Sequence, residues 1–108
     1  MSKTTLEVVT EATPEVIREV YHYATLTCDN LEEAQTKAFD LGNLLSGESR
    51  AARDAVDFGG PTTEMNEIIW EAALLEDEVT KIRARLDALV VKAKAVFATA
   101  ENALAQID

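Results

Sequence analysis

The stretch that decides the fold is the last part of the chain, residues 62–108, TTEMNEIIWEAALLEDEVTKIRARLDALVVKAKAVFATAENALAQID. It contains no Gly and no Pro, and its apolar residues recur in alternating steps of three and four, which is the spacing of a coiled-coil seam. The pattern predicts one long helix that begins near Thr62 or Thr63. The seam has thirteen positions: Met65, Ile68, Ala72, Leu75, Val79, Ile82, Leu86, Leu89, Ala93, Val96, Ala100, Ala103 and Ile107.

A helix of this length needs cover for its apolar face. About 45 residues extend about 67 Å at 1.5 Å per residue, whereas a compact chain of this size has a radius of gyration of only about 13 Å. We therefore expect the preceding residues to cover part of the seam and a second copy of the chain to cover the rest, because most oligomers are two-fold dimers. A purely intramolecular helical bundle is the alternative explanation of the same seam, and the sequence leaves it open.

The charges along this helix favour an antiparallel dimer. Residues 64–78 carry six acidic side chains and no base, whereas residues 81–94 carry five basic side chains and Asp87 as their only acid. An antiparallel pair places acid beside base, but each exposed pair contributes only about 0.2 to 1 kcal/mol, so charge selects the orientation more than it drives assembly. The predicted dimer interface consists of Val79, Ile82, Leu86, Leu89 and Val96.

The first part of the chain predicts three shorter helices. Thr13 and Pro14 form a helix start, since Thr caps and Pro suits the first helical position. Asp29-Asn30 is expected to interrupt or restart that helix, and Ser46-Gly47 is expected to end the second one. A third helix is predicted over residues 48–56, and Phe58-Gly59-Gly60-Pro61 is the strongest turn signal in the chain.

The predicted fold class is therefore all-α. It consists of three shorter N-terminal helices and one long C-terminal helix, arranged as a helical bundle or hairpin with coiled-coil-like dimer packing. Residues 1–12 are polar apart from Leu6, Val8 and Val9, and we interpret them as a flexible N-terminal arm or a short strand. Residues 13–108 are predicted to form a single helical domain.

Composition excludes several classes of function. The chain has 108 residues with 20 acidic and 10 basic side chains, a net charge of -10, which opposes binding to nucleic-acid phosphates and to anionic membranes. No apolar run approaches the roughly 20 residues of a membrane span, and the first residues lack a signal-peptide core. With one cysteine, Cys28, the chain cannot form an internal disulfide. We expect a cytoplasmic protein that is not an enzyme and has no cofactor, no metal and no direct contact with nucleic acid or membrane.

Three residues have side chains capable of chemistry, but each also has a simpler interpretation. Glu19 and His22 have the E-x-x-H spacing of half a di-iron site, but a single chain supplies only one of the two motifs that such a site needs. A surface histidine is the favoured interpretation. Cys28 has no cationic neighbour that would activate its thiol, and we interpret it as a small buried apolar residue.

The sequence offers one candidate partner-binding patch. Trp70 falls outside the seam, and apolar residues surround it at helical spacing. Two interpretations stay open: burial under the N-terminal helices, or a partner-binding anchor, since Trp is enriched at interface hot spots. The candidate partner-binding residues are Ile68, Ile69, Trp70, Ala73 and Leu74.

Two segments carry a resemblance to known families. They are residues 21–34, YHYATLTCDNLEEA, and residues 44–50, LLSGESR. The first group that they resemble is an uncharacterised family of small helical proteins of pseudomonads (DUF3077). In size and helical layout the chain is also similar to quorum-sensing antiactivators of the QslA type. That second resemblance implies a dimer that binds the ligand-binding domain of a LuxR-type transcription factor and blocks its dimerisation, and it transfers no individual binding residue.

These observations favour a protein-binding regulator that sequesters its partner, with transcription regulation in quorum sensing as the role that the resemblance implies. Two other classes stay open. The chain length is similar to that of the WXG100 secretion-associated helical hairpins, although Trp70 is not followed by x-Gly. The acidic run at residues 64–78 would also suit a nucleic-acid mimic that binds a basic protein.

Overall fold

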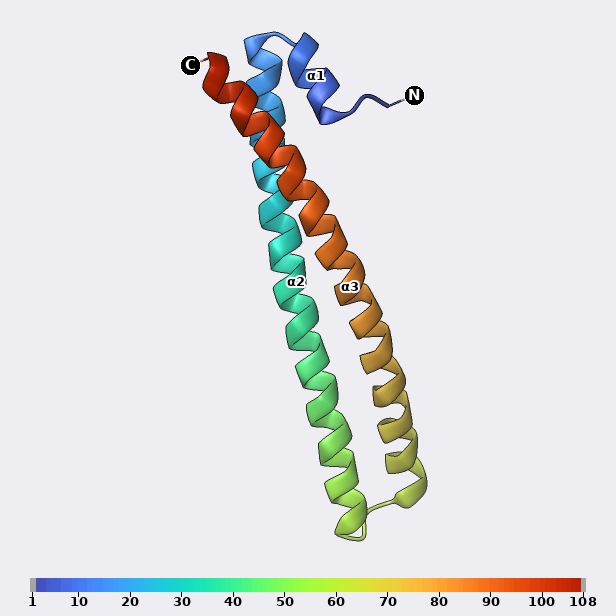
Figure 1. Cartoon of the computed structure of the whole chain (residues 1–108). Coiled ribbons are helices and arrows are strands. Elements are labelled where there is room, and N and C mark those ends of the chain that lie inside the picture. The colour runs from blue at the N-terminus through green and yellow to red at the C-terminus, as the bar shows by residue number, and fades with distance from the viewer. Residues whose placement is uncertain (1, 108) are drawn as a thin grey trace. The chain divides into compact units, whose positions relative to one another are not determined.

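The computed structural model describes residues 2–107 and consists of three helices: α1 (Thr5–Glu11), α2 (Pro14–Asp57) and α3 (Thr62–Ile107) (Figure 1). The described residues contain no strand, so the predicted all-α class is confirmed. The long C-terminal helix is also confirmed, because α3 begins at Thr62 and continues without a break to Ile107.

The prediction of three shorter helices before residue 58 is wrong. Helix α2 is continuous over 44 residues, and both predicted breaks lie in its interior. Gly47 does not adopt the left-handed conformation of a helix terminator, since Gly59 is the one glycine with a positive φ. At Asp29-Asn30 the helix continues with both side chains exposed.

The cost of these residues inside a helix explains the outcome. Asp and Asn each cost less than about 0.7 kcal/mol relative to Ala in a helix interior, and Gly costs about 1 kcal/mol. Burial along α2 outweighs these amounts, because Ile17 and Ala52 are buried and larger residues between them, such as Leu31 and Leu45, are half-buried. The helix-breaking tendency of these residues is therefore smaller than the stabilisation that packing gives along α2.

The start of α2 and the turn after it follow the sequence prediction. The hydroxyl of Thr13 accepts a hydrogen bond from the backbone N–H of Val16 at 3.4 Å, as a helix cap does. At the other end, the Gly60 N–H donates to the Ala55 carbonyl at 2.8 Å and the Gly59 N–H donates to the Val56 carbonyl at 3.0 Å. With Gly59 at φ 88°, this is a Schellman motif, which ends α2 before Pro61.

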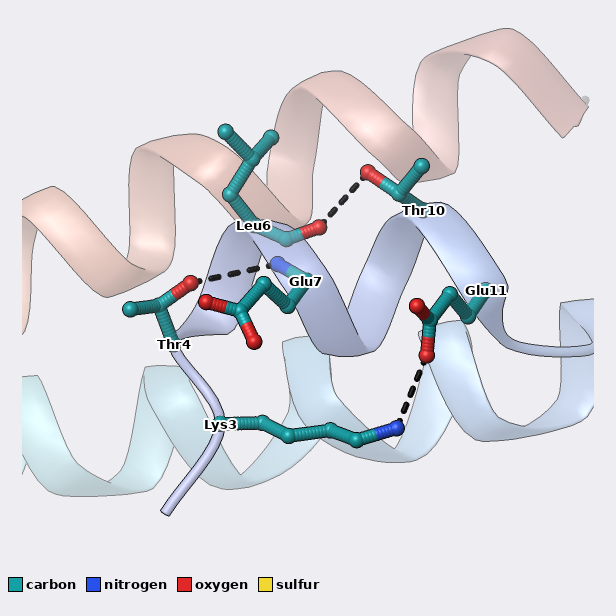
Figure 2. Close-up of polar contacts among 6 residues, drawn as sticks. All are labelled: Lys3, Thr4, Leu6, Glu7, Thr10 and Glu11. Carbon is teal, nitrogen blue, oxygen red and sulfur yellow. Dashed lines mark hydrogen bonds and ion pairs between the residues drawn. The ribbon is translucent and has the colours of Figure 1, made fainter. Parts of the chain in front are cut away.

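The N-terminal arm forms a helix where the sequence analysis expected a flexible arm or a strand. The Thr4 hydroxyl accepts a hydrogen bond from the Glu7 N–H at 3.3 Å and so caps α1 (Figure 2). Lys3 Nζ lies 2.8 Å from Glu11 Oε2 at the opposite end of this helix. The sequence signal for α1 was short, and Val9 supplies the missing stabilisation because its side chain is buried.

The described residues divide into two compact units. Unit 1 comprises the residues up to Glu33 together with those from Asp87 onward, and unit 2 is Ala34–Leu86. Each unit therefore contains one part of α2 and one part of α3, and unit 1 also contains α1. Its α2 and α3 segments meet at Tyr21 and Phe97, whose ring centroids are 5.3 Å apart.

The core of the protein is built mainly from small side chains. No large side chain is fully buried among the described residues. The buried apolar residues are Val9, Ile17, Ala24, Ala52, Ala72, Val79, Val90, Ala93 and Ala100. Alanines at these positions allow α2 and α3 to pack closely in each unit, but each contributes little burial.

Candidate protein-binding surfaces

The apolar seam of α3 separates into a buried set and an exposed set. In heptad notation, position a begins at Met65 and position d at Ile68, and each recurs every seven residues. Four a residues, Ala72, Val79, Ala93 and Ala100, are buried, and the remaining three are half-buried. Four d residues keep about half of their surface exposed: Ile68 at 43%, Leu75 at 50%, Ile82 at 49% and Leu89 at 47%. We call these four residues the exposed stripe.

The exposed stripe borders a groove in unit 2. Its apolar lining consists of Leu45 from α2 and Ile68, Ala72 and Leu75 from α3, and its volume is about 480 Å³. Four carboxylates also line it: Glu48, Glu64, Glu67 and Glu71. We call this feature the acidic groove. An apolar floor with an acidic rim suits a segment that presents apolar side chains flanked by lysine or arginine.

The five residues of the predicted dimer interface also differ in how far their side chains are exposed. Val79 is only 6% exposed, and a Cβ placed on Gly42 of α2 would lie 3.7 Å from its Cγ1. Packing within the chain therefore buries Val79. Ile82 and Leu89 remain exposed, whereas Leu86 and Val96 are half-buried.

The predicted partner-binding patch does not form one continuous surface. Trp70 is 68% exposed and Leu74 is 48% exposed, so the interpretation that Trp70 is buried under the N-terminal helices is wrong. These two residues are four apart and share the side of α3 opposite its buried a positions. Ile68 belongs to the exposed stripe, whereas Ile69 is half-buried on the other side of the seam. Ala73 is exposed beside Trp70 and Leu74.

Other exposed apolar residues were not singled out from the sequence. Phe39 on α2 is half-exposed, and the guanidinium carbon of Arg83 lies 5.0 Å from the centre of its ring. This cation–π contact joins α2 to α3 within unit 2. Leu44 is also exposed. Val91 lies outside the seam of α3, where the sequence allowed cover by the N-terminal helices, but it is exposed as well, so that expectation is wrong.

Helix α1 covers part of α3 in unit 1. Leu6 and Val9 of α1 line a cavity of about 470 Å³ together with α3 residues that include Thr99, Ala103 and Gln106. Ala103 is a d position, and Thr99 and Gln106 are g positions, which adjoin d on the helix surface. The d and g positions in the last turns of α3 therefore face α1. The exposed stripe lies before these turns, with Ile68, Leu75 and Ile82 in unit 2 and Leu89 in unit 1.

His22 and Cys28, the histidine and the cysteine of the chain, both lie on α2. His22 is exposed, with its ring centroid 5.3 Å from that of Tyr23. Cys28 is half-buried beside Phe97 and Lys94 in an open cavity of about 470 Å³. Within residues 2–107, no three His, Cys, Asp or Glu side chains are grouped so that they could hold a metal ion.

Two neighbouring carboxylates raise the pKa of the Lys81 ammonium. Lys81 Nζ lies 3.2 Å from Asp77 Oδ2 and 3.5 Å from Glu78 Oε1. The hydrogen bond to Asp77, its negative charge and that of Glu78 raise the pKa of the Lys81 ammonium above its usual value. All three side chains are exposed, so this contact is weak and sensitive to salt.

Comparison of the chain with protein-family models, curated proteins and solved structures finds no match. Across the residues that the structure describes, no helix has both the length and the hydropathy of a membrane span. The function must therefore be argued from the surfaces themselves.

Proposed function

We propose that the protein is a non-enzymatic, protein-binding regulator that acts as a homodimer and sequesters a partner protein. The observation that supports this proposal is the pair of exposed apolar surfaces on α3: the exposed stripe, and the outward face with Trp70 and Leu74. Contiguous exposed apolar patches mark interaction sites in soluble proteins. Two such surfaces on different sides of one helix allow one to bind a second copy while the other binds a partner.

Trp70 supplies the anchor for the partner. Its large ring, exposed beside Ala73 and Leu74, is the type of side chain that dominates binding energy when a partner desolvates it. An apolar helix face of this kind fits a groove or a flat apolar surface on the other protein. Each binding event removes partner molecules from their own self-association equilibrium, so inhibition follows by competition.

The resemblance described above makes the ligand-binding domain of a LuxR-type transcription factor the first partner to test. In this proposal the protein covers the apolar surface through which that domain dimerises, and so acts as an antiactivator. The net charge of -10 favours encounter with a partner surface that is basic around its apolar centre.

The experiment is a calorimetric titration of such a domain with the unsubstituted protein and with Trp70→Ala. We expect the substitution to weaken binding at least tenfold, because truncation of a hot-spot residue costs about 2 kcal/mol or more. Val91→Ala is the matched control, since Val91 is equally exposed on α3 but lies apart from the patch.

Circular dichroism must show equal helicity in all three proteins. If the domain binds the unsubstituted protein and Trp70→Ala equally well, the assignment of the anchor is wrong. If the domain does not bind at all, the LuxR-type partner is wrong. Mass spectrometry of proteins captured by the unsubstituted protein but not by Trp70→Ala then identifies the class of partner.

A further inference from the structure

We propose that the exposed stripe of α3 is covered by the same stripe of a second copy, antiparallel to it, in the register that places Ile82 opposite Ile82 of the second copy. This inference rests on the proposed homodimer and names its contact and register. In this arrangement Leu75 of each copy lies opposite Leu89 of the other, so the end of the acidic groove at Leu75 receives the basic part of a second α3.

The stripe has the geometry of a helix-pairing surface. Its four residues are spaced by seven along α3, and each is about half exposed. Residues at that spacing lie on one face of a helix when it supercoils with a neighbour. The a positions that would normally complete this face are already buried within the chain, so a narrow stripe remains for a second helix.

A helix already occupies the equivalent flank in unit 1. There α1 places Leu6 and Val9 against the d and g positions of the last turns of α3, and Val9 is buried. In the last turns of α3, this flank therefore has a helix of the same chain beside it. Beside the exposed stripe the chain supplies none: Ile68, Leu75 and Ile82 lie in unit 2, to which only α2 and α3 contribute, and Leu89 lies in unit 1 ten residues before Thr99, where the cavity lined by α1 begins on α3.

The charges beside the stripe are those of a self-complementary surface. Each of five charged g residues lies four positions before a d residue and therefore one helical turn from it on the same side of α3. The first three are acidic and the last two are basic. They are Glu64, Glu71, Glu78, Arg85 and Lys92.

The proposed register is the one that pairs these charges without conflict. With Ile82 opposite itself, Glu71 faces Lys92 of the second copy and Glu78 faces Arg85, and two-fold symmetry doubles both pairs. A shift of one heptad in one direction places Glu78 opposite its own copy, and a shift in the other direction does the same for Arg85. A parallel, in-register pair sets the acidic part of each α3 beside the acidic part of the other.

The charges that the register uses are available. Within residues 2–107, the side chains of Glu71, Arg85 and Lys92 take part in no ion pair or hydrogen bond. Glu78 lies at 3.5 Å from Lys81, the longer of that lysine's two contacts. These side chains can therefore pair across the interface at little cost to contacts within the chain.

Cysteine cross-linking tests the register. In a Cys28→Ser background, Leu75→Cys and Leu89→Cys are prepared separately, oxidised alone and then oxidised as a mixture. In the proposed register two copies of residue 75 are 14 residues apart, about 21 Å along the helices, far beyond the roughly 7 Å that a disulfide spans between Cα atoms. We expect a covalent dimer from the mixture and none from either protein alone.

Ile82→Cys and Val91→Cys complete the set. Ile82→Cys is expected to cross-link by itself, because this residue meets its own copy, whereas Val91→Cys on the outward face is not. A covalent dimer from Leu75→Cys alone would show a parallel pair and overturn the register. Absence of any product from the mixture would do the same.

Charge reversal gives a second measurement that does not depend on cysteine. Lys92→Glu turns two pairs repulsive, and we expect it to weaken dimerisation about tenfold at low salt, as measured by analytical ultracentrifugation. Glu71→Lys combined with Lys92→Glu should restore it, and failure of this rescue contradicts the register. A monomeric mass for the unsubstituted protein would overturn the homodimer itself, whereas a dimer with the wrong cross-links would overturn the register alone.

Discussion

Unit 1 and unit 2 are built from the same two long helices, yet they differ in how completely they cover α3. Unit 1 contains α1 as a third helical segment and buries six apolar side chains, which include Val9, Val90 and Ala100. Unit 2 has two segments and buries three, Ala52, Ala72 and Val79. The difference teaches that α1 adds cover only at the last turns of α3, where Val9 is buried, whereas d positions away from α1, Leu89 of unit 1 included, stay about half exposed.

The largest expected effect comes from comparing a substitution on the buried side of α3 with one on its exposed side, both within unit 2. Val79→Asp places a carboxylate at a buried a position, and we expect it to cost about 3 kcal/mol or more and to reduce helicity strongly. Ile82→Asp, three residues away on the exposed stripe, should leave helicity intact but abolish dimerisation. Urea unfolding monitored by circular dichroism measures the loss of structure, and light scattering measures the loss of the dimer. Equal loss of structure in both variants would show that the stripe is part of the core.

A smaller effect tests the cover that α1 gives to unit 1. Val9→Ser removes a buried apolar side chain, and we expect it to lower the free energy of unfolding by about 1–2 kcal/mol. Leu6→Ser is the matched control, because Leu6 lies on the same helix but is mostly exposed, and it should cost less than about 0.5 kcal/mol. Thermal or urea unfolding checks both. Equal effects would mean that α1 contributes no burial to unit 1.

The smallest effect concerns the exposed ion pairs of Lys81. The pKa of its ammonium is raised in the folded protein, so its contribution to stability is present below pH 10.5 and is lost as the pH rises through the raised value. We expect Lys81→Ala to lower the melting temperature slightly at pH 7 and low salt. The difference should vanish in about 1 M salt or at more alkaline pH. A difference that persists under both conditions would point to lost packing of the lysine side chain.

The sequence predicted the parts of the fold that depend on strong local signals. The absence of Gly and Pro after residue 61 gave α3 its full length, and Gly59-Gly60-Pro61 placed the turn. The division of the first part into three helices failed because Asp29, Asn30 and Gly47 are weak breaks that packing along α2 overcomes. Helix α1 was missed because a helix of seven residues is not stable alone and depends on the burial of Val9.

The candidate surfaces were only partly predictable. Heptad spacing identified the seam, but it could not show that Val79 packs within the chain while Ile82 stays open, since both fit the same pattern. Likewise, the position of Trp70 outside the seam raised the question of its exposure without answering it. That answer requires the placement of α2, which covers the a side of α3 and leaves the opposite side free.

The alanine-rich interior has a consequence for how the protein behaves in a cell. Methyl groups pack two helices closely but release little free energy as they leave water, so an isolated chain with Ala24, Ala52, Ala72, Ala93 and Ala100 at its centre gains little from folding by itself. In the proposed homodimer, association therefore adds to the stability of the folded chain, and we expect the melting temperature to rise with protein concentration. On that proposal, a chain bound to neither a second copy nor a partner is the least stable form, and it would be the first to be degraded in the cell.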